Sequence, residues 1–507
     1  MNIKQAKQEI QNTLLAYLSK DELGNYRIPT VRQRPVLLMG PPGIGKTQIM
    51  AQIAAETGVG LVAYTITHHT RQSAIGLPFI QQRTYGDRTF SVTEYTMSEI
   101  LASVYDLMEN TGIKEGILFL DEINCVSETL APMMLQFLQC KTFGNQALPE
   151  GWLIVAAGNP PEYNKSVRDF DVVTLDRVKR MDVTEDFAVW KEYARNKGIH
   201  GAVISYLDIK KEHFYHIETT VDGLQFATAR GWEDLSELIF AYEALGLKVD
   251  REVVGQYIQL PRIAKDFANY LELYYKYRRI YHVDDILRGQ WQAITMSELG
   301  AAPFDEKLSV MGLLLSRLSE SARQVRLQDE LTSSLHTALK TFKQAIVTRP
   351  PRQVLEQLIA GKQAALKMAK DAGQLDKERR ELSTRELNAL QDYCSRLVDE
   401  DIADENVFEA VKAWFGGEVD KRKSLARECS AMLDNAFAFL EQTFSLGQEL
   451  VMFVTEITAG FDTSWFVENF GCEAYFRHNK ELLFDETQNR IREQIAAAKA
   501  AQQEETL

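Results

Sequence analysis

Short apolar runs alternate with helix-like segments over the first part of the chain. The runs are VLLM at 36–39, LVAYTI at 61–66, ILFL at 117–120 and LIVAA at 153–157, and most of them end in loops that contain Gly, Pro or Asn. Short apolar runs bounded by turn signals are typical of strands that are buried on both faces of a parallel sheet. Residues 1–190 are therefore predicted to form an α/β domain.

The rest of the chain has a helical pattern. Apolar residues recur at helical spacing at Leu331, Leu335, Leu339 and Phe342. Eleven of the 13 prolines lie before residue 310, and proline is unfavourable in helix interiors. We expect a small helical lid domain at 191–290 and a larger helical domain, related to a partner or to assembly, at 291–507.

Two local signals refine this expectation. Ser383 followed by Glu386 is typical of a capping box, which predicts that a helix begins there. The tail from Glu481 is predicted to be a further helix that ends in a charged run.

Composition narrows the function class. A chain of 507 residues exceeds what one hydrophobic core usually serves. The net charge of −14 argues against a protein that mainly coats nucleic acid, because neutralising phosphates requires clustered Lys and Arg. The five cysteines are scattered without CxxC spacing, which favours reduced thiols over disulfides or zinc. No long uninterrupted apolar run occurs, so we expect no membrane span and a cytoplasmic location.

A phosphate-binding loop is the strongest motif. GPPGIGKT follows the first predicted strand and precedes a helix-like segment, matching G-x-x-x-x-G-K-[ST]. The glycines allow backbone N–H groups to point at phosphate oxygens, Lys46 is expected to reach the β- and γ-phosphates, and the Thr47 hydroxyl is expected to ligate Mg²⁺. The predicted nucleotide-contacting residues of this loop are Gly40, Pro41, Pro42, Gly43, Ile44, Gly45, Lys46 and Thr47. The predicted fold is thus an α/β P-loop NTPase core, a parallel sheet flanked by helices, followed by a small helical lid and a large all-α C-terminal region.

Polar residues follow two later strands. Asp121 and Glu122 come directly after ILFL, at the strand end where open α/β sheets bind ligands. We expect Asp121 to hold Mg²⁺ and Glu122 to polarise the attacking water. Asn159 ends the run WLIVAAGN and is predicted to contact that water and the γ-phosphate. The alternative is a turn asparagine, because two prolines follow it.

The order of these motifs resembles the AAA+ ATPases, and within them the MoxR family of the helix-2-insert clade. Two insertions support the resemblance, one at 77–95 with Gly86 and Asp87 as a predicted hairpin turn, and one at 139–152. The resemblance covers residues 20–245, which is under half of the chain.

The resemblance also implies roles for three arginines. TLDRVKR is similar to the family's arginine box, which implies that Arg177 is an arginine finger offered to a neighbouring subunit, with Arg180 as the second choice. The alternative is that both are surface arginines at a helix start. The segment FATARGWEDLSEL is similar to the start of a sensor-2 helix and implies that Arg230 contacts the nucleotide, although related sequences often have proline where this chain has Ala229.

The family resemblance further implies ATP and Mg²⁺ as cofactors and a homo-oligomer, usually a hexameric ring, that remodels a protein client. Such proteins often work with a partner that bears a von Willebrand factor A domain.

Two other functions are open. One is a nucleic-acid-directed motor or loader in a defence system. It requires a basic pore, and the candidate pore-lining residues are Arg83, Arg88 and Lys141. A nucleotide-gated scaffold would instead depend on the helical C-terminal half. The aromatic run at 267–281 is interpreted as an amphipathic packing helix, and the apolar run at 451–470 as buried core.

Overall fold

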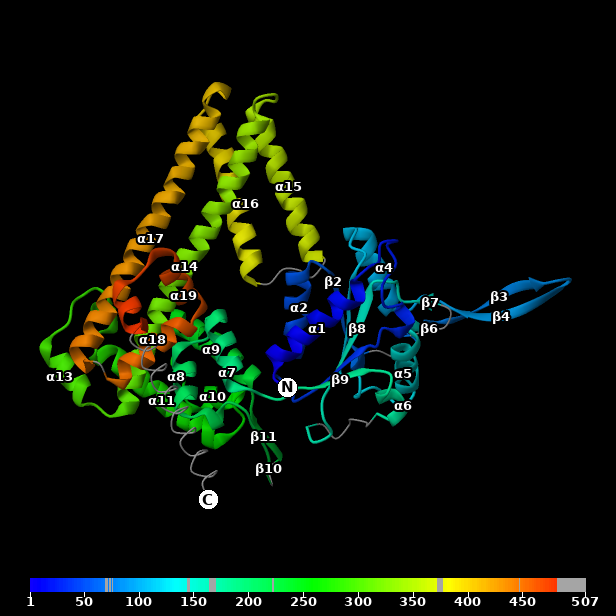
Figure 1. Ribbon diagram of the computed structural model, residues 1–507, viewed down its shortest axis with the longest axis horizontal. Helices are drawn as coiled ribbons and strands as arrows, with labels where there is room; N and C mark the ends of the chain where they lie inside the picture. Colours follow the sequence, from blue (N-terminus) through cyan, green and yellow to red (C-terminus); the bar gives the residue numbers. More distant parts are fainter. Residues whose placement is uncertain are drawn as a thin grey trace, which may run out of the picture. The chain divides into compact units, whose positions relative to one another are not determined.

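The computed structural model describes residues 1–480 apart from 69–71, 73, 75, 144–145, 164–169, 221–222, 372–376 and 446 (Figure 1). The chain divides into two compact units. The first comprises Met1–Val189 with Ala345–Asp401, and the second comprises Trp190–Gln344 with Ile402–Leu507. The helix predicted from Glu481 lies outside the described residues.

A five-stranded parallel sheet forms the centre of the first unit, in the order β2-β5-β8-β1-β9. Its strands are β1 Val36–Met39, β2 Gly60–Thr65, β5 Gly116–Asp121, β8 Trp152–Gly158 and β9 Lys179–Asp182. The four predicted strands are confirmed. The apolar pattern does not predict β9, because this strand at the end of the sheet has one buried apolar residue, Met181.

Helices cover both faces of the sheet. They are α1 Ile3–Leu18, α2 Lys46–Thr57, α4 Glu99–Thr111, α5 Ala131–Cys140 and the short α6 Val172–Leu175. Successive strand residues point to opposite faces, so Val36 and Leu38 join a core with α1 and α2, whereas Leu37 and Met39 join a core with α4 and α5. The predicted parallel sheet flanked by helices is therefore confirmed.

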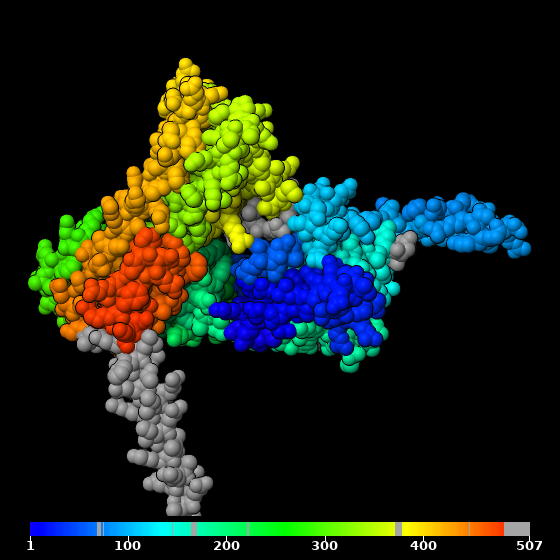
Figure 2. Space-filling model, turned by 45° about the horizontal axis from the view of Figure 1, so that its top comes forward, coloured from blue at the N-terminus to red at the C-terminus, as the bar shows by residue number. Residues whose placement is uncertain are grey.

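The first predicted insertion is a β-hairpin. Strands β3 (Pro78–Tyr85) and β4 (Arg88–Tyr95) are antiparallel, with Gly86 and Asp87 at the turn. Figures 1 and 2 show this hairpin extending away from the helices and the sheet of its unit. The second insertion contains the two-residue strands β6 (Thr142–Phe143) and β7 (Gln146–Ala147), while residues 144–145 between them lie outside the described residues.

A helical hairpin from late in the chain belongs to the first unit. Its helices α15 (Pro351–Asp371) and α16 (Lys377–Asp399) pack against each other, and α15 packs against α4. Arg379 Nη1 donates 3.3 Å to the Ala55 carbonyl in the last turns of α2. Residues 345–401 therefore group with the α/β core rather than with the rest of the region that we predicted as one domain at 291–507. The helix start predicted at Ser383 is wrong, because Ser383 lies inside α16.

The second unit is mostly helical, as predicted. Its helices are α7 Phe187–Lys197, which begins at the unit boundary, α8 Gly201–Ile209, α9 Ala229–Leu245, α10 Arg251–Tyr257, α11 Pro261–Ile280, α12 Val283–Leu287, α13 Ala293–Ala301, α14 Phe304–Ala345, α17 Val407–Phe444, α18 Gln448–Ala459 and α19 Phe461–Phe470. An antiparallel pair, β10 (His216–Thr220) with β11 (Gly223–Ala227), interrupts the region expected to be wholly helical. Helix α11 buries Phe267, Leu271 and Tyr274, in agreement with the packing-helix interpretation.

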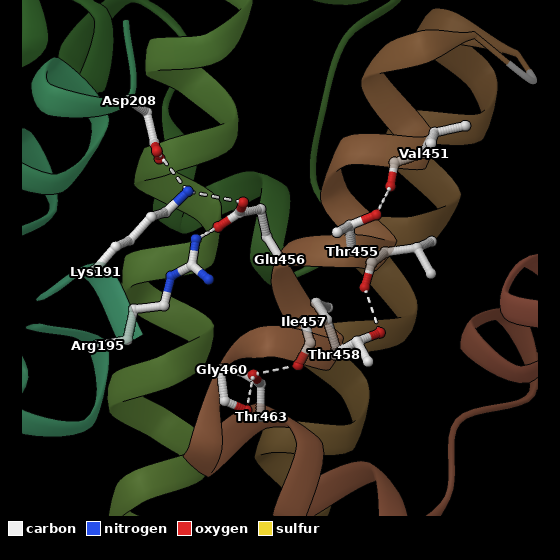
Figure 3. A network of polar contacts seen from close by, with 11 residues as sticks. Lys191, Arg195, Asp208, Val451, Thr455, Glu456, Ile457, Thr458, Gly460 and Thr463 are labelled. Carbon is white, nitrogen blue, oxygen red and sulfur yellow. Dashed lines mark hydrogen bonds and ion pairs between the residues drawn. The ribbon is translucent and has the colours of Figure 1, made fainter. Parts of the chain in front are cut away.

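Polar contacts join the early and late segments of the second unit. Lys191 Nζ lies 2.5 Å from Asp208 and 2.9 Å from Glu456, and Arg195 also pairs with Glu456 (Figure 3). At the bend between α18 and α19 the Thr463 hydroxyl donates to the carbonyls of Ile457 and Gly460. The segment at 451–470 thus takes part in the core of this unit.

No single helix among the described residues is long and apolar enough to cross a membrane. Helices α18 and α19 meet the length and composition criteria only as a pair that is bent by 88°. Phe453, Val454, Ile457 and Phe466 of this pair are buried, so one apolar face of the pair packs inside the protein.

Candidate functional site

The phosphate-binding loop connects β1 to α2. Gly43 and Gly45 have φ values of 76° and 94°, a left-handed conformation that glycine adopts without steric cost. Gly45 is the N-cap of α2, and Lys46 and Thr47 begin the helix. The loop therefore wraps around the positive end of the helix dipole, which favours an anion.

Lys46 is buried, and its amine is fully coordinated. Its Nζ donates to the carbonyls of Gly40 at 2.5 Å and Pro41 at 2.9 Å, and to Asn159 Oδ1 at 2.8 Å. An ammonium group has three donors, so these three oxygens satisfy it. A phosphate would have to replace at least one of them, and an anionic oxygen is the stronger acceptor.

Thr47 and Asp121 lie close enough to share one cation. The Thr47 hydroxyl donates 3.0 Å to Asp121 Oδ2, joining the first turn of α2 to the end of β5. A hydroxyl and a carboxylate oxygen are hard ligands of the kind that Mg²⁺ prefers, so this donor pair fits the predicted ion.

Glu122 stands in an unusual backbone conformation. Its φ is 57°, a left-handed value that is uncommon outside glycine and is often found at functional sites. Its N–H donates 2.9 Å to Asp121 Oδ1, and the Thr67 hydroxyl donates 2.8 Å to Glu122 Oε2. Thr67 belongs to no motif in the sequence, although its place just beyond β2 puts it at the same edge of the sheet.

Asn159 follows the last residue of β8. Besides accepting from Lys46, it is held by Asn124, whose side chain contacts the Asn159 backbone. Asn124 lies in the turn after β5 and carried no signal in the sequence pattern. The structure thus places five predicted site residues at the carboxyl edge of the sheet, namely Lys46, Thr47, Asp121, Glu122 and Asn159.

The predicted arginines lie elsewhere. Arg177 is exposed just beyond α6, and its guanidinium donates to Gln139 at the end of α5. Arg180 lies on β9 and donates 2.9 Å to Asp182 of the same strand. Arg230 is exposed in the first turn of α9, where a helix start was expected, and it belongs to the second unit. The roles of all three stay predictions.

Lys141 is not the accessible basic residue that a nucleic-acid pore requires. Its side chain is buried at the C-cap of α5, and its Nζ lies 3.5 Å from Gln33 Oε1. Burial lowers the pKa of Lys141 from 10.5 to about 8. The expectation that it lines a pore is therefore wrong.

The comparison with protein families agrees with this geometry. Residues 35–178 match the family described as AAA domain (dynein-related subfamily). This segment is an AAA domain. The AAA domain contains the phosphate-binding loop, the ends of β5 and β8, and Arg177, although it covers well under half of the chain. The chain thus carries a nucleotide-binding domain of the AAA+ ATPase class.

The comparisons with curated proteins and with solved structures do not extend the assignment beyond the AAA domain. No curated protein matches the chain. Among solved structures, NtrX from Brucella abortus in complex with ADP is similar at 15% identity and a TM-score of 0.27. That similarity covers 47% of this chain and 49% of NtrX, so the chain spans about half the length of that protein.

Proposed function

We propose that this chain is a MoxR-like ATPase that assembles into a ring, hexameric as in the family it resembles, and uses ATP hydrolysis to remodel a protein client. The observation that carries the proposal is the gathering of Lys46, Thr47, Asp121 and Asn159 at one sheet edge, with Glu122 beside Asp121. The choice of ATP follows the resemblance, because the loop contacts phosphates and not the base. A cytoplasmic location belongs to the same proposal.

Each residue of the candidate site has its own role in hydrolysis. Lys46 binds the phosphates in place of its present carbonyl partners, and Thr47 and Asp121 hold Mg²⁺. When bound, Mg²⁺ neutralises charge on the phosphate oxygens. Glu122 orients the attacking water and accepts its proton, and Asn159 contacts the same water.

A shared active site is the second element of the proposal. The hydrogen bonds of Arg177 and Arg180 go to Gln139 and Asp182, both outside the phosphate-binding loop. Both arginines are exposed, as an arginine that contacts a nucleotide on a neighbouring subunit must be. An arginine supplied in this way stabilises charge on the transferring phosphoryl group.

The β3–β4 hairpin is the candidate contact for a client. Phe79, Ile80, Tyr85 and Phe90 are all exposed on it, which is an unusual concentration of apolar surface. Movement of this hairpin during the ATP cycle would act on a protein bound to it. A partner with a von Willebrand factor A domain remains a suggestion of the family resemblance.

The nucleic-acid alternative is weaker than the remodelling proposal. The hairpin carries Arg83 and Arg88, but Asp87 and Glu94 balance them, and Arg83 is paired with Glu94. Lys141 is buried. A hairpin with no net charge has little electrostatic attraction for a polyanion.

A nucleotide-gated scaffold would place the biological role in the helical C-terminal half. Deletion of residues 295–507 would be a poor test of it, because the deletion removes α15 and α16, which pack with the α/β core. Partner binding by the full-length protein with and without nucleotide is the better measurement.

The decisive test measures ATP turnover per subunit over a roughly hundredfold range of protein concentration. We expect the specific activity of the wild type to rise with concentration as subunits meet, and Arg177→Ala to stay low. Glu122→Gln should bind ATP yet hydrolyse it about tenfold more slowly or worse. Arg32→Ala, which removes another exposed arginine of the same unit, is the matched control and should behave as the wild type.

The outcomes separate the parts of the proposal. Absence of ATP hydrolysis by the wild type at every concentration would overturn the ATPase assignment. Equal, concentration-independent turnover in the wild type and Arg177→Ala would remove Arg177 from the active site. Unchanged turnover in Glu122→Gln would remove Glu122 from catalysis.

A further inference from the structure

Asn124 forms a two-point clamp on the backbone of Asn159. Its Nδ2 donates 2.8 Å to the Asn159 carbonyl, and its Oδ1 accepts from the Asn159 N–H at 3.3 Å. Only 3% of Asn124 is exposed, so water does not replace these bonds readily. A side-chain amide that donates to and accepts from one residue fixes both the position and the orientation of that residue.

The end of β8 is shaped to admit this clamp. A Cβ on Gly158 would lie 2.6 Å from Asn124 Oδ1, closer than the atoms can approach. Gly158 also accepts from the Gly40 N–H at 3.3 Å, at the start of the phosphate-binding loop. The absence of a side chain at residue 158 therefore lets β5, β8 and the loop meet at one point.

Through the clamp, a chain of hydrogen bonds joins the turn that carries Glu122 to Asn159 and Lys46. Asn124 lies two residues after Glu122, in a turn closed by the Cys125 N–H donating 2.9 Å to the Glu122 carbonyl. The Ile123 N–H donates 2.9 Å to the Ala157 carbonyl and attaches the same turn to β8. Asn159, held by Asn124, accepts from Lys46 at 2.8 Å.

We propose that Asn124 is a positioning residue for ATP hydrolysis, a role that rests on the function proposed above. It sets the Asn159 amide against Lys46 and keeps it in register with the turn that carries Glu122. Removing the clamp frees the Asn159 backbone while the loop and the Mg²⁺ ligands stay in place. The hydrolytic step should therefore suffer more than nucleotide binding.

Two substitutions separate the donor from the acceptor of the clamp. Asn124→Ala removes both bonds, and we expect kcat to fall about tenfold or more while the affinity for a non-hydrolysable ATP analogue changes by less than about threefold. Asn124→Asp keeps the acceptor but sets a carboxylate oxygen against the Asn159 carbonyl, and a carboxyl group can donate there only when it is protonated. Burial raises the pKa of a carboxyl group, so lowering the pH should restore the donor.

The pH profile is the readout that a purely structural role would not produce. The ratio of kcat for Asn124→Asp to kcat for the wild type should rise about threefold or more between about pH 8 and pH 6. Asn110→Asp introduces the same chemical change at an exposed position on α4 and should give a flat ratio. A flat ratio for Asn124→Asp, or an Asn124→Ala kcat within about twofold of the wild type, overturns the proposal.

Hydrogen exchange tests the clamp independently of hydrolysis. In a peptide covering 153–163, the Asn159 amide should exchange about tenfold faster or more in Asn124→Ala than in the wild type, and stay protected in Asn124→Asp. Unchanged exchange in Asn124→Ala contradicts the clamp even if that variant hydrolyses ATP slowly. An inactive wild type with the expected exchange pattern would overturn the proposed ATPase function and leave the clamp standing.

A double substitution completes the test. Gly158→Ala should reproduce the kinetic defect of Asn124→Ala, because the new methyl group displaces the Asn124 side chain. The pair together should then be no slower than Asn124→Ala alone, since the remaining close contact of the methyl group, Met39 Sδ at 3.1 Å, needs a shift of only a few tenths of an ångström. Additive losses would show that Gly158 acts through another contact and would contradict the proposed link.

Discussion

The Thr67 hydroxyl donates a 2.8 Å hydrogen bond to Oε2 of Glu122. Thr67 follows β2 and Glu122 follows β5, so the bond links the ends of two neighbouring parallel strands. The backbone of Glu122 is left-handed, and its N–H is already bound to Asp121. Thr67 is therefore the contact that fixes the direction of the carboxylate.

Loss of this contact should slow hydrolysis. Thr67→Val keeps the shape of the side chain but leaves the Glu122 carboxylate free to rotate, and we expect kcat to fall about three- to tenfold. Thr67→Ser should retain most of the activity because it keeps the hydroxyl. Steady-state turnover checks this, with Thr57→Val at the far end of α2 as a control that should be neutral. A Thr67→Val enzyme as fast as the wild type would show that Glu122 is oriented by something else.

Substitution of Thr47 should change the Mg²⁺ concentration that ATP hydrolysis requires. The Thr47 hydroxyl and Asp121 lie 3.0 Å apart and are the proposed ligands. Thr47→Ala should raise the Mg²⁺ concentration needed for half-maximal turnover about tenfold, whereas Thr47→Ser should stay near the wild type. Titration of Mg²⁺ after chelation measures this, and an unshifted curve for Thr47→Ala would remove Thr47 from the metal site.

Lys141 should reduce stability at neutral pH. Burial lowers its pKa from 10.5 to about 8, so the folded state binds this proton less tightly than the unfolded state does. The loss of folding stability is therefore greatest below about pH 8. It shrinks as the pH rises from about 8 to 10.5, because in this interval the folded state has lost the proton while the unfolded chain still carries it. Lys141→Met should therefore raise the free energy of unfolding by about 1–3 kcal/mol at pH 7, and by less at pH 10.

Thermal unfolding at pH 7 and pH 10 checks the Lys141 prediction. The control is Lys114→Met, which replaces an exposed lysine of the same unit and should change stability by less than about 0.5 kcal/mol. Equal effects of Lys141→Met at both pH values would contradict the shifted pKa.

A buried ion pair should be costly to break in the second unit. Arg326 Nε donates 2.6 Å to Asp462 Oδ1, and the two residues are 5% and 2% exposed. Asp462→Asn should lower the free energy of unfolding by about 3 kcal/mol, because Arg326 then loses its buried counter-charge and keeps the more exposed Glu330, which its Nη1 meets at 2.8 Å. The double variant Arg326→Met with Asp462→Leu should recover much of that loss.

Urea unfolding measures these free energies, with a variant of an exposed ion pair as the control. Glu320→Gln breaks the exposed pair with Arg317 on the same helix and should cost less than about 1 kcal/mol. A cost of similar size for Asp462→Asn would mean that the buried pair adds no more than a surface one.

The sequence was sufficient for the α/β core and for much of the candidate site. Three of the four strands that it predicted, β1, β5 and β8, are buried on both faces, so their apolar runs carry the signal by themselves. Lys46, Thr47, Asp121 and Asn159 could be found because each directly follows such a strand or lies in the loop after it. Strand β9 was missed, because Met181 is its one buried residue and a single apolar position makes no run.

The tertiary structure alone decided the contacts between segments that lie far apart in the chain. Thr67 and Asn124 are ordinary polar residues until parallel pairing brings the ends of β2, β5 and β8 together. The packing of α15 on α4 and the burial of Lys141 likewise depend on which surfaces meet. Helical periodicity predicts that a helix has an apolar face, but it does not predict which element that face packs against. Local pattern determines which elements form, whereas long-range packing determines which side chains reach one another, and the proposed catalytic arrangement belongs to the second kind.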